Sequence, residues 1–90
     1  MFKKRRSIRL NYKKQGLVYF ICINHRDMPP QVQEKILRLC RTVAGEDADA
    51  LHEFLTNENT SATGVSLRYY INEKRLYALR RRFYEEWYNS

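Results

Sequence analysis

Basic side chains recur at helical spacing along residues 72–87, where no Gly or Pro interrupts the chain. Lys74, Ala78 and Arg81 are separated by four and three residues, which places them on one face of a helix. Arginine guanidinium groups hold phosphate and guanine in bidentate fashion, and lysine ammonium groups hold phosphate as point charges. This face therefore predicts recognition of a nucleic acid.

The cysteines and histidines do not form a pattern typical of catalysis or metal binding. Cys22, His25, Cys40 and His52 could supply four ligands to zinc, but their spacings match no zinc finger. Cys40 falls in an apolar stripe, which favours buried thiols. Neither histidine has a plausible nucleophile beside it, and the three glycines form no phosphate-binding loop. We therefore expect no enzyme activity, no metal and no cofactor.

Two helices joined by a tight turn must position the basic face. Thr60 and Ser61 can cap the first helix, and Asn72 followed by Glu73 suits the start of the second. The apolar face of the first helix comprises Ala62, Val65 and Tyr69, and that of the second comprises Leu76, Leu79, Phe83 and Trp87, flanked by Tyr84.

This segment resembles helix-turn-helix DNA-binding domains in its apolar positions, which are Val65, Tyr69, Ile71, Leu76 and Leu79. The family often has Gly in the turn, just before Ile71, where this chain has Tyr70. The resemblance implies base-reading positions at Asn72, Glu73, Lys74, Tyr77, Ala78 and Arg81, and we expect Lys74, Tyr77, Ala78 and Arg81 to contact base edges. The whole chain also resembles small, mostly uncharacterised proteins of bacteriophages and conjugative elements in Gram-positive bacteria.

The net charge of +7 is segregated along the chain. Residues 1–14 hold seven basic and no acidic residues, residues 42–67 hold five acids and no Lys or Arg, and residues 68–82 sum to +5. We expect residues 1–14 to form a flexible basic arm on DNA, although such a segment can also be a solvated tail. The phosphate contacts that we expect are made by Lys3, Lys4, Arg5, Arg6, Arg9, Arg68, Arg75 and Arg82.

Residues 15–28 fit both a helix and a strand. A lone strand leaves its backbone hydrogen bonds unmade, so we favour a helix over residues 15–26. Its buried face is then expected to comprise Leu17, Phe20, Ile21, Asn24 and Met28.

The middle of the chain predicts two further helices. Pro30 can open a helix over residues 30–44, and Gly45 can end it. Its buried face comprises Val32, Ile36, Leu39, Cys40 and Val43, and the next helix turns Ala48, Leu51, Phe54 and Leu55 inward. We therefore predict an all-α fold, a compact bundle of about five helices over residues 15–90, ending in a helix-turn-helix over residues 60–88.

The apolar run LVYFICI is too short to span a bilayer, and polar residues follow it instead of a signal-peptide cleavage site. We expect a soluble, cytoplasmic protein that does not associate with a membrane and has no small-molecule substrate.

The functional prediction is a DNA-binding protein, a small transcriptional regulator or accessory factor of a phage or mobile element, which reads the major groove of double-stranded DNA with helix 72–88. A homodimer or a protein partner would add selectivity. The alternatives are a phage or mobile-element protein–protein module, as an assembly component or an inhibitor of a host nucleic-acid enzyme, and a non-specific RNA or single-strand binder. Pairs of Arg81 with Glu85 and Arg82 with Glu86 could instead make a solvated helix face. The target sequence and the regulatory role stay open.

Overall fold

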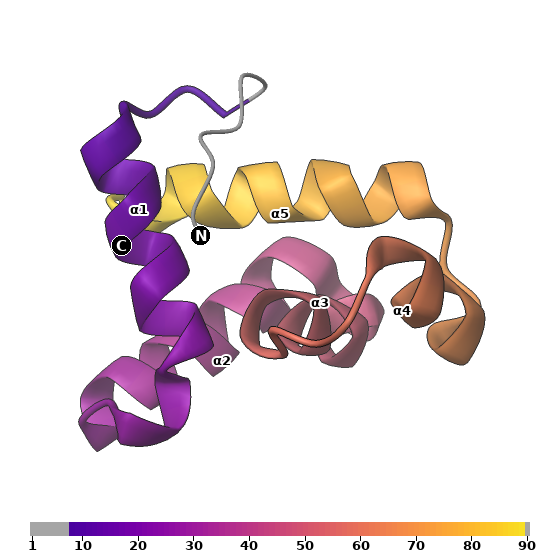
Figure 1. Ribbon diagram of the computed structural model, residues 1–90, viewed down its shortest axis with the longest axis horizontal. Helices are drawn as coiled ribbons and strands as arrows, with labels where there is room; N and C mark the ends of the chain where they lie inside the picture. The colour runs from indigo at the N-terminus through magenta and orange to yellow at the C-terminus, as the bar shows by residue number, and fades with distance from the viewer. Residues whose placement is uncertain (1–7, 90) are drawn as a thin grey trace.

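The computed structural model describes residues 8–89, and these residues form helices and short connections without a strand (Figure 1). The all-α class is therefore confirmed, and the ambiguous segment after Gln15 is helical. The elements are α1 (Tyr12–Ile23), η1 (His25–Asp27), α2 (Pro30–Ala44), η2 (Gly45–Asp47), α3 (Ala48–Thr56), α4 (Ala62–Tyr69) and α5 (Glu73–Trp87), where η marks a single 3-10 turn.

The long helix α5 lies along one side of the molecule, with α2 and α3 packed beneath it (Figure 1). α1 crosses the C-terminal end of α5, and α4 lies near its N-terminal end. The core between these helices is apolar, and its largest fully buried side chains include Phe83, Ile36, Leu51, Leu76 and Val65. Burial of these side chains is the main stabilising term for a domain of this size.

α1 begins three residues before the predicted start, because Asn11 caps it by accepting a hydrogen bond from the Lys14 amide at 2.9 Å. Ile8 is only 4% exposed and packs in the core. The Gln15 amide group is fully buried and donates hydrogen bonds to the carbonyls of Ile8 at 3.3 Å and Leu10 at 2.8 Å. Residues 8–14 thus belong to the folded domain and not to the predicted arm; residues 1–7 of that arm lie outside the described residues.

The predicted buried face of α1 is wrong. α1 buries Gln15, Val18 and Cys22, whereas Leu17 is 51% exposed and Phe20 is 57% exposed. Residues 17–23 are all apolar, so the sequence pattern could not distinguish the inner side of the helix from the outer one. The hydrogen bonds from Gln15 to the preceding segment fix which side faces the core.

α2 has the predicted bounds and the predicted inner face. Ile36, Leu39, Cys40 and Val43 are buried. Gly45 ends the helix with a φ of 57° and a ψ of −120°, a conformation that residues with a Cβ atom rarely adopt. The chain can therefore turn sharply from α2 through η2 into α3.

Candidate nucleic-acid interface

The corner between α4 and α5 is built from local hydrogen bonds. Ser61 caps α4 by accepting from the Gly64 amide at 3.1 Å, and Asn72 caps α5 by accepting from the Lys74 amide at 2.7 Å. Between the helices, the Ile71 amide donates to the Ser66 carbonyl at 3.2 Å. The Ile71 side chain is 5% exposed and belongs to the core, so the corner is anchored from inside.

Tyr70 occupies the turn in a left-handed conformation, with a φ of 55° and a ψ of 44°. This is the position where the resemblance to helix-turn-helix domains leads one to expect Gly. The left-handed region costs a residue with a Cβ atom about 1–2 kcal/mol. Because the Tyr70 side chain is 96% exposed, it gains little packing energy in return. The turn therefore carries backbone strain that its neighbours hold in place.

We expect Tyr70→Gly to raise the free energy of unfolding by about 0.5–1 kcal/mol, since relief of the strain exceeds the extra chain entropy of glycine. Urea denaturation followed by circular dichroism measures this change. Leu67→Gly is the matched control, because Leu67 is 72% exposed but lies within α4. That variant should lose about 0.5–1 kcal/mol. A loss of stability in Tyr70→Gly would contradict the assignment of strain.

The outward side of α5 carries the residues that we expect to read bases. Lys74 and Arg81 are exposed and Ala78 is half-buried, while Leu76 and Leu79 face the core. The structure thus brings Lys74, Ala78 and Arg81 together along one side of the helix, as the spacing predicts. Asn72 and Glu73 lie at its N-terminal end, where Asn72 is the cap.

Tyr77 is 47% exposed and leans toward α3. Its ring meets that of Phe54 edge-on, with centroids 5.8 Å apart. The Arg80 guanidinium lies 4.8 Å from the Phe54 ring and 5.0 Å from the Tyr77 ring. Such cation–π contacts hold a side chain in one place. The prediction did not include Arg80, although its position three residues after Tyr77 is a signal for contact between the two.

Arg68 and Arg75, for which we expect phosphate contacts, are exposed, but each forms an ion pair with a carboxylate. Arg68 pairs with Glu53 and donates to the Thr60 hydroxyl at 3.0 Å. The Arg75 Nε donates to an Asp47 carboxylate oxygen at 2.8 Å. Folding brings the acidic segment beside these two arginines. The sequence does not reveal these ion pairs, because the partners lie far apart along the chain. Exposed pairs of this kind contribute only about 0.2–1 kcal/mol, so a phosphate can compete for either arginine.

Arg81 and Arg82 do not form the helical ion pairs considered above: among residues 8–89, neither pairs with Glu85 or Glu86. The Glu85 carboxylate instead accepts from the Arg9 backbone amide at 3.1 Å. Arg82 is exposed and donates to the Val43 carbonyl at 3.4 Å. Arg81 is therefore exposed and has no carboxylate partner in the described part of the chain, and the same holds for Lys74 and Arg82.

Of the phosphate-contacting residues expected in the arm, only Arg9 is described, and its backbone amide donates to Glu85 at the C-terminal end of α5. Its side chain is exposed. Lys3, Lys4, Arg5 and Arg6 lie outside the described residues, so their phosphate contacts stay a prediction.

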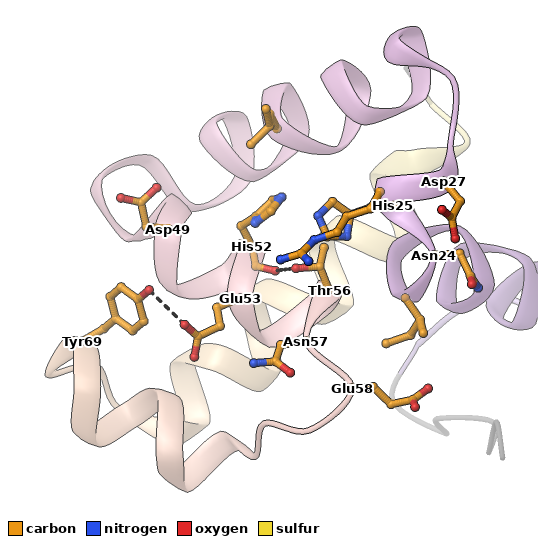
Figure 2. Close-up of a pocket in the computed structure, with 13 residues that line it drawn as sticks. Asn24, His25, Asp27, Asp49, His52, Glu53, Thr56, Asn57, Glu58 and Tyr69 are labelled. Atoms are coloured by element: carbon orange, nitrogen blue, oxygen red, sulfur yellow. Dashed lines mark hydrogen bonds between the residues drawn. The ribbon is translucent and has the colours of Figure 1, made fainter.

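An open pocket of about 750 Å³ lies between η1, α3 and the end of α4 (Figure 2). The rings of His25 and His52 meet edge-on in it, with centroids 5.3 Å apart. Burial and the neighbouring His25 lower the pKa of His52, whereas Asp49 opposes this shift. Tyr69 is 39% exposed, unlike the apolar position predicted for it, and donates its hydroxyl to Glu53 at 3.2 Å (Figure 2).

The two thiols are buried, as the apolar stripe predicts. Burial raises the pKa of Cys22 and, together with nearby Asp49, raises that of Cys40 to about 12. Both therefore stay protonated and behave as apolar groups. Within residues 8–89, no three His, Cys, Asp or Glu side chains gather as metal ligands do.

The helices of the described segment are all too short or too polar to cross a membrane. In comparisons with protein-family models, curated proteins and solved structures, this chain has no match.

Proposed function

We propose that this chain binds double-stranded DNA through a helix-turn-helix made of α4 and α5, with α5 in the major groove. The observation that carries this proposal is the exposed side of α5 with Lys74 and Arg81, on a helix whose opposite side is fixed by buried Phe83 and Trp87. A rigid helix loses little conformational entropy on binding, so little of the free energy of its contacts with DNA is needed to offset ordering of the helix.

Each exposed side chain of α5 has a role in this proposal. Arg81 grips guanine, and Lys74 and Tyr77 contact neighbouring base edges. The Ala78 methyl group faces the thymine methyl, a contact typical of small apolar side chains. Arg82 and Arg9 hold phosphates, which positions the helix without reading sequence. Arg68 and Arg75 reach phosphates only by leaving Glu53 and Asp47.

The biological role that we propose is a small transcriptional regulator or accessory factor of a phage or mobile element. The assignment to such an element rests on the sequence resemblance alone, and the regulatory role rests on the proposed DNA binding. One short helix reads few base pairs, so selective binding calls for a second copy or a partner.

Selection of bound sites from a random pool of DNA duplexes tests the proposal. We expect an enriched motif, and we expect Arg81→Ala to weaken binding to that motif by about 1–3 kcal/mol while hardly changing binding to random duplexes. Arg26→Ala is the matched control: it removes the same charge from η1, at the end of α1 away from α5 (Figure 1). It should leave selective binding unchanged. Equal losses in both variants would rule out Arg81 as a base-reading residue.

The second candidate is a protein–protein module. It is favoured by the pairing of Arg68 and Arg75 with carboxylates, which lowers the positive potential beside α5. In that case the random pool yields no motif, and a purified host nucleic-acid enzyme is bound by the wild type and not by Arg81→Ala.

A further inference from the structure

The outer side of α1 is an apolar face that the described part of the chain leaves open. Leu17 is 51% exposed and Phe20 is 57% exposed, on the side opposite buried Val18 and Cys22. Because residues 17–23 are all apolar, this part of α1 is apolar on every side. A helix with that composition is normally covered on both sides, and here the bundle covers only one.

The pattern on this face is self-complementary. Lys13, Leu17 and Phe20 of α1 together with its C-cap Asn24, called the outer α1 face below, follow at spacings of four, three and four. The same spacings are obtained when the helix is read backwards. In an antiparallel pair, Leu17 of each copy therefore meets Phe20 of the other, and Lys13 meets Asn24. Gly16, next to Leu17, lets two helices approach closely because it has no side chain.

The charges of α1 favour the same arrangement. Its first turn contains Lys13 and Lys14 and no acid, and its last turn contains no basic residue. The N-terminal end is therefore mismatched to the helix dipole, which is positive at the N-terminus and negative at the C-terminus, and the negative C-terminal end has no cation in its last turn. An antiparallel copy places each Lys13 beside the negative end of the other helix, whereas a parallel copy places Lys13 against Lys13. The opposite charges of Arg26 and Asp27, which follow α1 in η1, cancel near this end of the helix.

We propose that the chain forms an antiparallel homodimer through the outer α1 face. The contact is one helix wide and buries less than the roughly 800 Å² per partner of a standard interface. The dimer is therefore weak and reversible. It forms without DNA, so the proposal does not rest on the proposed function.

Sedimentation equilibrium of the full chain, from about 1 µM to about 1 mM, tests the dimer over the range of weak association. We expect the wild type to pass from monomer to dimer, and the double variant Leu17→Ser/Phe20→Ser to associate at least tenfold more weakly. The matched control is Leu67→Ser, which removes an apolar side chain that is 72% exposed on α4. It should dimerise like the wild type.

Several results would overturn the proposal. One is a wild type that stays monomeric throughout, and another is a double variant that dimerises like the wild type while circular dichroism shows it folded. A third is dimerisation only after removal of residues 1–7, which would identify that segment as the cover of the outer α1 face.

Lys13→Glu separates the interface from a purely structural role. In the monomer, Glu suits the N-terminal end of α1, so the free energy of unfolding should stay level or rise. In the antiparallel dimer, the same Glu meets a negative helix end, so dimerisation should weaken about three- to tenfold. Undiminished dimerisation of Lys13→Glu would exclude the antiparallel arrangement.

Discussion

Phe83→Ala is expected to lower the free energy of unfolding by about 3–5 kcal/mol, because it leaves a cavity where α5 meets the core. The Phe83 side chain is 0% exposed, and its ring centroid lies 5.9 Å from that of Trp87. A small domain has about 5–15 kcal/mol of stability in total, so this variant keeps little of it. Thermal or urea denaturation followed by circular dichroism measures the loss.

Leu67→Ala is the control for this prediction, because Leu67 is 72% exposed and its truncation should change stability by no more than about 0.5 kcal/mol. A loss below about 1 kcal/mol in Phe83→Ala would show that the underside of α5 is not tightly packed. The rigidity of α5, on which the proposed DNA reading depends, would then have to be abandoned.

Binding to duplex DNA is expected to weaken about 10³- to 10⁵-fold between about 50 and about 200 mM salt, if about six to ten phosphates are contacted. The physical reason is the release of counterions from the duplex as cationic side chains replace them. Fluorescence anisotropy with a labelled duplex measures the binding constant at each salt concentration, and hence the slope of its logarithm against the logarithm of the salt concentration. Arg82→Ala should reduce the magnitude of this slope by about one, because one phosphate contact is lost. It should weaken binding to cognate and random duplexes alike.

Arg41→Ala is a suitable control for the salt experiment, because Arg41 is an exposed arginine of α2 and has no part in the proposed contacts. Its slope should equal that of the wild type. A wild-type affinity that changes less than about tenfold over this range would mean that at most about two phosphates are contacted, and major-groove docking would be excluded.

The sequence predicts most accurately where strong local signals act together. Pro30 and Gly45 bound α2, and its apolar residues except the exposed Leu37 fall on one side, so both its ends and its inner face are predicted correctly. The caps Ser61 and Asn72 likewise mark the starts of α4 and α5. These features depend on residues a few positions apart, and such short-range interactions can be recognised in a single sequence.

The features that the sequence could not predict depend on distant partners. The inner side of α1 is selected by Gln15, which bonds to carbonyls of a segment that shows no regular pattern. Arg75 is engaged because η2 brings Asp47 to it across 28 positions of the chain. The left-handed turn at Tyr70 could not be predicted from the residue itself, since tyrosine rarely adopts this conformation.

The hydrogen bond from the Arg9 backbone amide to the Glu85 carboxylate fixes the chain at one end of α5. Any DNA contact made by the residues before Arg9 must therefore start from this point. That point is at the far end of α5 from Lys74, and a 15-residue helix is about 22 Å long. This length corresponds to about six base pairs at 3.4 Å each. On a bound duplex, nuclease protection should therefore be lopsided, reaching farther on the flank that faces Glu85 than on the one that faces Lys74.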